Sequence, residues 1–306
     1  MRCKIQSLIL PRKSEPVTLT SSEDNMNFSR RMLLDGGLKA TITLPVWMQL
    51  GLARAAARLP KTLTTSRADD HALRTKRLVV IDPGHGGRDP GCIGNGNIYE
   101  KDIVLATALD FRNALQRGGY DVMMTRSTDI FLPLPARVDF AEQHHAAIFV
   151  SVHANSVAPN TSVRGASVFT FSPDPSDPLA AEIAHDENGV ERIANPTFKG
   201  VSPQVAKILF SLMDHSTKLQ SLDLQRQMVK SLAENVDMLP NPARHATFAV
   251  LQSAAIPSIL VETAFLSNPQ DEAQLRTNNF RIRLAQSMKS AVDAWFLARR
   301  HAMANL

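Results

Sequence analysis

Short apolar runs alternate with helix-like segments after residue 76, and this alternation restricts the folds that the sequence can adopt. The run 77–81, RLVVI, is rich in β-branched residues and stops at the turn-forming letters DPG, as a buried strand does when it enters a loop. Residues 100–116 carry apolar side chains at helical spacing and stop before a Gly-Gly pair. We therefore predict an α/β sandwich, in which a mostly parallel or mixed β-sheet is flanked by helices on both faces.

The remaining elements follow from the same patterns. We expect further strands over 120–125, 147–153, 165–171, 247–252 and 258–262. We expect further helices over about 135–145, from the Asn268-Pro269 pair onward and over 280–299. Residues 172–245 interrupt the alternation, because they are polar, helical in pattern and without a convincing strand. The sequence thus predicts one domain over 77–300 that contains a helical insert over 172–245.

The N-terminal segment 1–57 has the features of an export signal. Arg30 and Arg31 precede a mildly apolar stretch and a group of small residues, which is the pattern of a twin-arginine signal, and Met26 is a candidate for the true start. The alternative is an amphipathic first helix, but charged residues and glycines interrupt its apolar face. No run approaches the roughly 20 apolar residues of a membrane span, so we expect no stable membrane anchor. Residues 58–76 read as a linker, and the expected destination is the periplasm.

The basic charge of the chain does not indicate a nucleic-acid partner. The net charge is +5 and the sequence pI is about 9.4. However, 8 of the 34 Lys and Arg residues but only 4 of the 29 Asp and Glu residues lie in the segment 1–57, so the rest of the chain is close to neutral. A polyanion-binding surface requires a concentrated basic patch. We therefore expect no nucleic acid among the partners.

Three residues form a candidate metal site. His85 in IDPGHGG, Glu100 in YEKD and His153 in FVSVHAN stand at the ends of expected strands or at the start of an expected helix, where a sheet presents functional groups to solvent. Two histidines and a glutamate are a known ligand set for catalytic zinc, which keeps one position open for water. Each residue also has an ordinary structural alternative: capping a turn, meeting a helix dipole, or bonding a neighbouring carbonyl group. Their joint placement favours a site for one Zn²⁺ ion per chain.

A fourth candidate, Glu262, ends the apolar run SILV. A carboxylate at the end of a buried strand is costly unless it is paired, protonated or near a metal. A zinc hydrolase also needs a general base that takes a proton from the attacking water and passes it to the leaving amine. Glu262 is our candidate for this base, and the alternative is a structural ion pair with Arg244 or another basic residue.

Several separate segments occur in an order that indicates a family. They are VVIDPGHGGRDPGCIGNGNIYEKDIVL, MTRSTDIFLPLPARVDFA, IFVSVHAN and NPARHATFAVLQSAAIPSILVETAFLSNPQDEAQL, and together they span roughly 77–295. This set resembles the zinc-dependent N-acetylmuramoyl-L-alanine amidases, the division-type cell-wall amidases in particular. The resemblance implies that His85, Glu100 and His153 bind zinc and that Glu262 is the catalytic carboxylate. It also implies a role for Arg244 in substrate binding or site architecture.

The resemblance also accounts for the insert. In the division branch of this family, a helix of this region lies over the active site, and one of its glutamates occupies the open zinc position until an activator protein displaces it. The matching stretch here is AAEIAHDENGVERIANP, in which Glu187 is the best-aligned candidate, with Glu182 and Glu191 as alternatives. A fourth protein ligand would block water activation directly. The alternative is a solvated helix face without a regulatory role.

The function implied by the resemblance is hydrolysis of the amide bond between N-acetylmuramic acid and L-alanine in peptidoglycan, for cell-wall remodelling and daughter-cell separation. A zinc peptidase that cuts within the stem peptide would use similar groups, and it is one alternative. A non-catalytic peptidoglycan-binding module is another, although the intact ligand set and Glu262 argue against it. The sequence departs from the family at Cys92, where alanine is usual, and we interpret this cysteine as a small buried residue.

Overall fold

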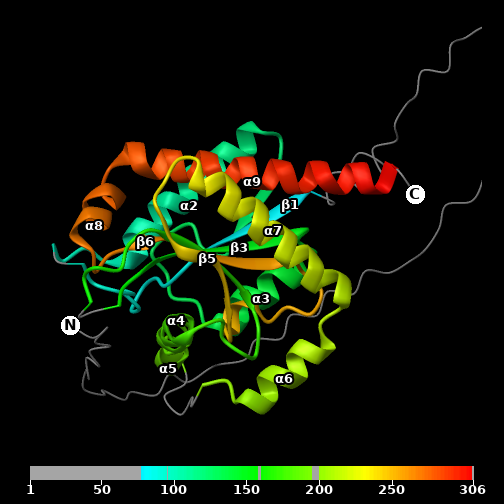
Figure 1. Cartoon of the computed structure of the whole chain (residues 1–306), viewed down its shortest axis with the longest axis horizontal. Helices are drawn as coiled ribbons and strands as arrows, with labels where there is room; N and C mark the ends of the chain where they lie inside the picture. The colour runs from blue at the N-terminus through cyan, green and yellow to red at the C-terminus, as the bar shows by residue number, and fades with distance from the viewer. Residues whose placement is uncertain (1–76, 95, 158–159, 195–199, 305–306) are drawn as a thin grey trace, which may run out of the picture. The chain divides into compact units, whose positions relative to one another are not determined.

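The computed structural model describes residues 77–94, 96–157, 160–194 and 200–304. The predicted export signal over 1–57 and the predicted linker over 58–76 lie outside the described residues. The described part contains a six-stranded mixed sheet with helices on both faces, as the alternating pattern predicted (Figure 1). Among these residues, no helix is both long and apolar enough to cross a membrane.

The strands follow the order β2-β1-β3-β6-β4-β5 across the sheet. Neighbours in the series β2, β1, β3 and β6 are parallel, whereas β4 runs antiparallel to β6 and parallel to β5. β1, β3 and β6 are buried along their whole length, which explains their nearly continuous apolar sequences. The bounds are β1 (Leu78–Pro83), β2 (Asp121–Met124), β3 (Ile148–Asn155), β4 (Ala166–Phe171), β5 (Met238–Ala246) and β6 (Ser258–Phe265).

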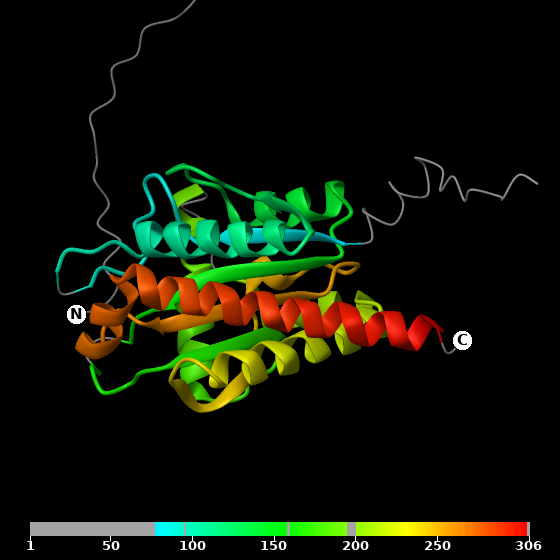
Figure 2. The same cartoon turned by 90° about the horizontal axis from the view of Figure 1, so that it is seen from above.

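Three long helices cover one face of the sheet. α2 (Glu100–Arg117), α9 (Asn278–Ala304) and α7 (His215–Ala233) lie side by side there (Figure 2). Each of them directs an apolar stripe at the sheet, and Trp295 of α9 and Leu224 of α7 are almost completely buried in this layer. α7 is therefore part of the main core.

Shorter helices cover the opposite face. α3 (Leu134–Gln143), α4 (Pro178–Asn188) and α6 (Pro203–Leu212) pack there together with the 3₁₀ helix η2 (Ala249–Leu251), and α5 (Glu191–Ala194) follows α4. α8 (Pro269–Leu275) begins after Asn268 in the expected cap-then-proline order. This second layer contains α4, the helix expected to regulate the site.

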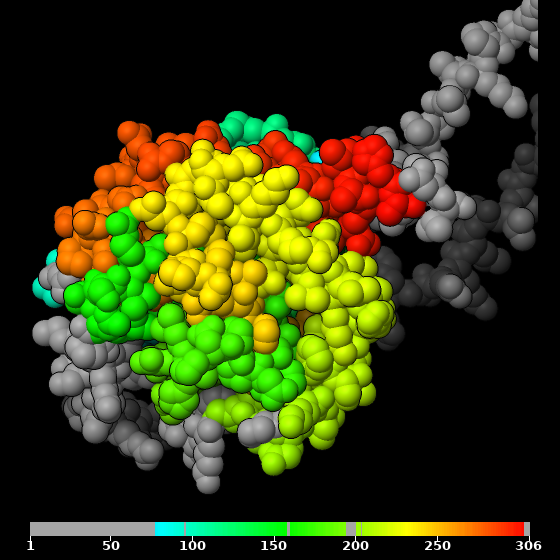
Figure 3. Space-filling view, in the orientation of Figure 1, coloured from blue at the N-terminus to red at the C-terminus, as the bar shows by residue number. Residues whose placement is uncertain are grey.

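The expectation that 172–245 contains no strand was wrong. Residues 238–246 form β5, the edge strand beside β4, seen in gold below α7 in Figure 3. Its sequence MLPNPARHA reads as a turn because it contains two prolines, but an edge strand tolerates proline, since one side of its backbone is unpaired. The strand expected over 247–252 was also wrong, because η2 lies there. The predicted insert over 172–245 is thus too long at its C-terminal end, because α7 and β5 belong to the main core and the sheet.

Candidate metal centre

Three side chains converge from separate elements at the carboxyl edge of the parallel strands. His85 lies in the loop after β1, Glu100 is the first residue of α2, and His153 lies near the end of β3. One ligand atom of each and one of Glu187 on α4 all lie within 4.8 Å of one another. All four residues are buried. The structure therefore brings together the three ligands that the sequence suggested, and it adds a glutamate from α4.

The carboxylate of Glu100 lies between the two imidazole rings. Its Oε2 is 3.0 Å from Nε2 of His85, and its Oε1 is 3.3 Å from Nδ1 of His153. The same two oxygens accept hydrogen bonds of 2.9 Å from the backbone N–H groups of Cys92 and Ala154. These bonds hold the carboxylate in one orientation while each oxygen keeps a lone pair for a further partner.

Asp89 orients the His85 ring from the other side. Its Oδ2 lies 2.8 Å from Nδ1 of His85. This contact places the proton of a neutral ring on Nδ1, so Nε2 presents its lone pair to the cluster. A carboxylate behind a histidine is a usual outer partner of a metal-bound imidazole. Asp89 was not among the residues predicted from the sequence, although its position four residues after His85 in HGGRD was a usable signal.

The donor set fits a zinc ion. Within the described part of the chain, Nε2 of His85 and Nδ1 of His153 are buried and lie close to carboxylate oxygens, but neither makes a hydrogen bond of normal geometry. A buried polar atom without a partner costs about 1–3 kcal/mol, which a bound ligand can offset. Two imidazole nitrogens and a carboxylate oxygen are typical zinc ligands, and three such ligands leave a fourth position for water or substrate.

The electrostatics of the cluster favour a cation at its centre. Burial lowers the pKa of His153, but the carboxylates of Glu187 and Glu100 outweigh this effect and raise that pKa to about 10. Burial also lowers the pKa of His85, and the carboxylates of Glu100, Asp89 and Glu187 raise it well above its usual value. Conversely, burial raises the pKa of Glu100, but the two histidines hold it well below its usual range. The cluster thus stabilises positive charge, which protons or a metal ion can supply.

Gly84 leaves the space that the second histidine occupies. A Cβ atom at position 84 would lie only 2.3 Å from Cε1 of His153. The backbone at this position is fixed, because the N–H of Gly84 donates to the carbonyl oxygen of Val152 at 3.0 Å. Any larger residue would therefore displace the imidazole ring. The glycine before His85 is explained by the packing of a ligand that lies on another strand.

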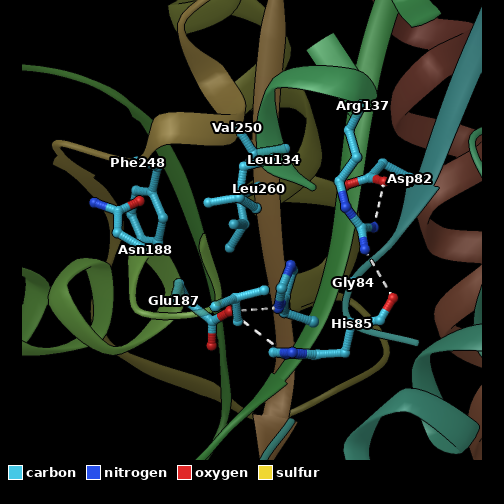
Figure 4. A pocket seen from close by; sticks show the side chains of 12 residues that line it. Asp82, Gly84, His85, Leu134, Arg137, Glu187, Asn188, Phe248, Val250 and Leu260 are labelled. Atoms are coloured by element: carbon cyan, nitrogen blue, oxygen red, sulfur yellow. Dashed lines mark hydrogen bonds and ion pairs between the residues drawn. The ribbon is translucent and has the colours of Figure 1, made fainter. Parts of the chain in front are cut away.

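Glu187, the residue before the last of α4, covers the cluster. Its Oε2 lies 3.0 Å from Nδ1 of His153 and 3.4 Å from Nε2 of His85 (Figure 4). The cavity lined by these residues has a free volume of only about 10 Å³, far below the size of a substrate pocket. Glu182 is exposed, and Glu191 accepts a hydrogen bond from the start of α3. Of the three candidate glutamates, only Glu187 reaches the cluster.

Glu262 lies beside His153 in the sheet, since the two residues are paired in register on β6 and β3. Its side chain has no exposed surface, and in the described structure neither carboxylate oxygen has a hydrogen-bond partner. Burial raises the pKa of Glu262 well above its usual value; the charge of His153 opposes this, and the carboxylates of Glu187 and Glu100 raise the pKa further. A buried carboxyl group with a raised pKa next to a metal site is suited to proton transfer.

Arg244 lies on β5 and contacts α4. Its Nη1 is 2.6 and 2.7 Å from the two carboxylate oxygens of Asp177, the N-cap residue of α4, and its Nη2 donates to the carbonyl oxygen of Pro240. The alternative in which Arg244 neutralises Glu262 was wrong, because its ion pair is with Asp177 and the Glu262 oxygens have no such partner. Arg244 therefore helps to hold α4 in its position.

Sequence comparison agrees with this arrangement. Residues 79–294 match the Amidase_3 family model, described as N-acetylmuramoyl-L-alanine amidase. The chain is 36% identical over 273 residues to N-acetylmuramoyl-L-alanine amidase AmiA of Escherichia coli strain K12, a match that covers 88% of this chain and 92% of the relative. It is 35% identical over 219 residues to the amidase AmiC of Neisseria meningitidis serogroup B, covering 71% of this chain and 52% of the relative.

Solved structures agree as well. The amidase AmiC2 of Nostoc punctiforme has a TM-score of 0.53 and 27% sequence identity, over 72% of this chain and 98% of that protein. The amidase Ami1 of Mycobacterium smegmatis, at 18% identity and a TM-score of 0.55 over 72% of this chain and 97% of that protein, shares the fold. The family match includes the three clustered ligands and Glu262. The chain therefore belongs to the N-acetylmuramoyl-L-alanine amidase family.

Proposed function

We propose that the chain is a zinc enzyme that hydrolyses the amide bond between N-acetylmuramic acid and L-alanine in peptidoglycan. The names of its relatives support this substrate, and the buried cluster of His85, Glu100 and His153 supports zinc as the metal. The observation that carries the proposal is the position of Glu262, a buried carboxyl group without a hydrogen-bond partner beside this cluster. Exported through the predicted signal, the enzyme would act in the periplasm in cell-wall remodelling and daughter-cell separation.

The residues of the site have distinct roles in hydrolysis. A bound zinc ion supplies Lewis-acid activation of the scissile carbonyl group and of the attacking water. His85, Glu100 and His153 would hold the ion. Glu262 accepts a proton as the water oxygen bonds to the carbonyl carbon, and it donates a proton to the amine of L-alanine as the C–N bond breaks. The raised pKa of Glu262 supports a role in which one carboxyl group both accepts and donates a proton.

We further propose that α4 keeps the enzyme inactive through Glu187. The contacts of its Oε2 with His153 and His85 support this, because a carboxylate oxygen so close to both ring nitrogens could serve as a fourth zinc ligand. A carboxylate in this position would exclude both the attacking water and the substrate carbonyl group. The small volume of the cavity is consistent with a closed state.

Polar contacts at both ends of α4 support a held conformation. Asn188 donates from Nδ2 to the carbonyl oxygen of Thr247 at 2.6 Å and accepts a hydrogen bond from the N–H of Ala249 at 2.8 Å. At the other end of the helix, Arg244 binds the N-cap carboxylate of Asp177. These contacts join α4 to β5, to Thr247 and to the first residue of η2. Their loss would release the helix without a change in the ligands themselves.

A partner protein that displaces α4 would activate the enzyme. Among solved amidases, CwlD of Clostridioides difficile has been determined in complex with the GerS lipoprotein. For this chain we propose an activator that displaces α4 and draws Glu187 away from the histidines. Such a partner needs a greater affinity for the open conformation than for the closed one, because only that difference shifts the equilibrium.

The proposed activity is tested by digestion of purified peptidoglycan with the zinc-loaded protein, alongside a Glu187→Ala variant that lacks the covering carboxylate. Mass spectrometry of the products should find free peptides that begin with L-alanine, together with glycan strands that carry unsubstituted lactyl groups. Shortened peptides still attached to muramic acid would indicate a zinc peptidase instead. Zinc-loaded Glu187→Ala protein that binds peptidoglycan but releases no product would indicate a non-catalytic binding module.

A further inference from the structure

The loop that carries His85 has an unusual backbone. His85, Gly86 and Gly87 have φ values of +59°, +123° and +59°. A positive φ is unfavourable for a residue with a side chain, so His85 keeps this conformation only if its surroundings hold it. The loop also sets the direction of the first zinc ligand. The contacts that hold the backbone around His85 therefore help to set the geometry of the metal centre.

Arg137 on α3 holds this loop from one side. Its Nη1 donates to the carbonyl oxygen of Pro83 at 2.7 Å and to Oδ1 of Asp82 at 2.8 Å. Its Nη2 donates to the carbonyl oxygen of His85 itself at 2.8 Å, a contact visible in Figure 4. The planar guanidinium group thus binds the backbone on both sides of Gly84 with a fixed spacing.

Arg126 holds the same loop and links it to the second ligand. Its Nε donates to the carbonyl oxygen of Pro83 at 3.0 Å, and its Nη2 donates to that of Gly84 at 2.6 Å. The same Nη2 also donates to the carbonyl oxygen of Lys101 at 3.0 Å. Lys101 directly follows Glu100 at the start of α2. One side chain therefore joins the backbone next to His85 with the backbone next to Glu100.

The segment between these arginines packs closely on the loop. Asp129 accepts a hydrogen bond of 2.7 Å from the N–H of Gly87 and forms an ion pair of 2.6 Å with Lys101. A Cβ atom on Gly86 would lie 2.2 Å from the carbonyl oxygen of Ile130. This segment is the second one in the resemblance to the amidases, MTRSTDIFLPLPAR, and it contributes no ligand to the metal cluster.

Both arginines are almost fully buried, with exposed fractions of 2% for Arg126 and 1% for Arg137. Burial lowers the pKa of Arg126 to about 10, and the positive charge of Arg137 lowers it as well. A buried guanidinium group is costly, and an apolar side chain would fill the same space more favourably. In the described structure, the carboxylate of Asp82 accepts a hydrogen bond from Arg137. The hydrogen bonds of Arg126 go to backbone carbonyl oxygens.

We propose that Arg126 and Arg137 are positioning residues of the metal centre, which hold the backbone at His85 and Glu100 so that the ligand atoms converge on one ion. They act through the carbonyl oxygens of the loop and contribute no atom to the cluster of ligand side chains. The inference rests on the proposed zinc site. It differs from a general stabilising role, because it predicts an effect on metal affinity and ligand geometry in protein that remains folded.

The test compares the wild-type chain with Arg137→Lys and Arg126→Lys. Lysine keeps the positive charge but cannot bridge two carbonyl oxygens with fixed spacing. We expect zinc affinity, measured by competition with a coloured chelator, to fall about 10- to 100-fold in both variants, as for losses of other outer partners. We also expect an altered visible absorption spectrum of the cobalt-substituted protein, because the spectrum reports ligand geometry.

The matched control is Arg281→Lys. Arg281 is also mostly buried and donates to a backbone carbonyl oxygen, that of Leu275, but it lies on α9 outside the metal cluster. Its replacement should leave zinc affinity and the cobalt spectrum unchanged. Circular dichroism and thermal unfolding of the metal-free proteins establish which variants are folded.

The results decide whether the two arginines position the metal ligands. Folded arginine variants with the zinc affinity and cobalt spectrum of the wild type would overturn the inference. If these variants do not fold, Asp129→Ala replaces them, because the Asp129 side chain is 48% exposed and its loss removes only the bond to Gly87 and the pair with Lys101. Unchanged zinc affinity in that variant would also overturn the inference. Failure of the wild type to bind zinc would instead refute the proposed zinc site.

Discussion

His153 and Glu262 occupy paired positions on the neighbouring parallel strands β3 and β6. Because side chains alternate between the two faces of a sheet, a shift of either strand by one residue would move one of them away from the other. The register of a fully buried pair of strands therefore brings a proposed metal ligand and a carboxyl group together. No short motif contains both residues, and the proposed chemistry depends on this pairing.

The first prediction concerns proton transfer. Glu262→Gln keeps the shape of the side chain but removes the base, so turnover of peptidoglycan should fall about 10²- to 10⁴-fold. Zinc content, measured by mass spectrometry of the metal, should stay at the wild-type level, because Glu262 does not belong to the ligand cluster. Loss of metal together with activity would assign Glu262 a structural role, and full activity would remove it from the mechanism.

The second prediction concerns the metal. Treatment with a chelator should abolish activity, and added zinc should restore it. Glu100→Ala should bind zinc far more weakly, since this carboxylate lies between both imidazole rings, and zinc should restore little activity to it. The control is Asp102→Ala, at an exposed position of α2. Lys101→Ala is not a suitable control, because the Lys101 side chain donates to the carbonyl oxygen of Gly87 in the loop that carries His85. Activity that survives complete removal of metal would refute the zinc mechanism.

The third prediction concerns α4. Glu187→Ala should raise the basal rate, because three ligands remain and the fourth position becomes open. Asn188→Ala should act in the same direction by removing two hydrogen bonds, worth together about 1–3 kcal/mol or roughly a 5- to 150-fold change in the ratio of closed to open states. Glu182→Ala, an exposed position on the same helix, serves as the control. Unchanged or lower rates in both variants would count against inhibition by α4.

The fourth prediction concerns the dependence of stability on pH. Burial raises the pKa of Asp82, but Arg137 and hydrogen bonds from Thr125, Arg137 and Ser151 outweigh it and hold the pKa below the usual 3.8. The stabilisation from this lowered pKa is therefore complete above pH 3.8 and is lost as the pH falls through the pKa of the folded state. Asp82→Asn should cost about 3–5 kcal/mol at neutral pH, since it leaves Arg137 without its buried partner.

This fourth prediction is measured by denaturant unfolding of the metal-free proteins at a series of pH values. The difference between wild type and Asp82→Asn should be constant near neutral pH and should shrink in acid. Asp223→Asn, which removes a surface pair with Arg226, should cost no more than about 1 kcal/mol. A cost at Asp82 as small as that of the surface pair would show that the buried pair contributes little.

The fifth prediction tests whether α7 belongs to the core. Leu224→Ala should lower the free energy of unfolding by about 2–5 kcal/mol, because this side chain is completely buried between the sheet and α9. Leu219→Ala, at a position of α7 that is 52% exposed, should change it by about 0.5 kcal/mol or less. Equal effects would mean that α7 packs loosely. The same reasoning predicts that deletion of 172–245 as a unit would unfold the protein, since it removes β5 as well as α7.

The sequence by itself determined the α/β class, most of the elements and the three residues that we propose as metal ligands. Continuous apolar runs and helical patterns are local, so residues 77–81, 100–116 and 147–153 predicted β1, α2 and β3 closely. The ligands could be selected because each stands at an end of such an element, where a parallel sheet gathers its functional groups. The resemblance to the amidases implied the same three residues, and the family match spans all of them.

Only the tertiary structure decided which residues meet across the chain. It selected Glu187 among three glutamates, because only that side chain of the three points at the histidines. It placed β5 at the sheet edge despite its prolines, and it brought Arg137 to the carbonyl oxygen of His85, 52 positions earlier in the chain. Local patterns carry no information about such contacts, because they depend on how separately formed elements pack together and on which buried polar groups must then find partners.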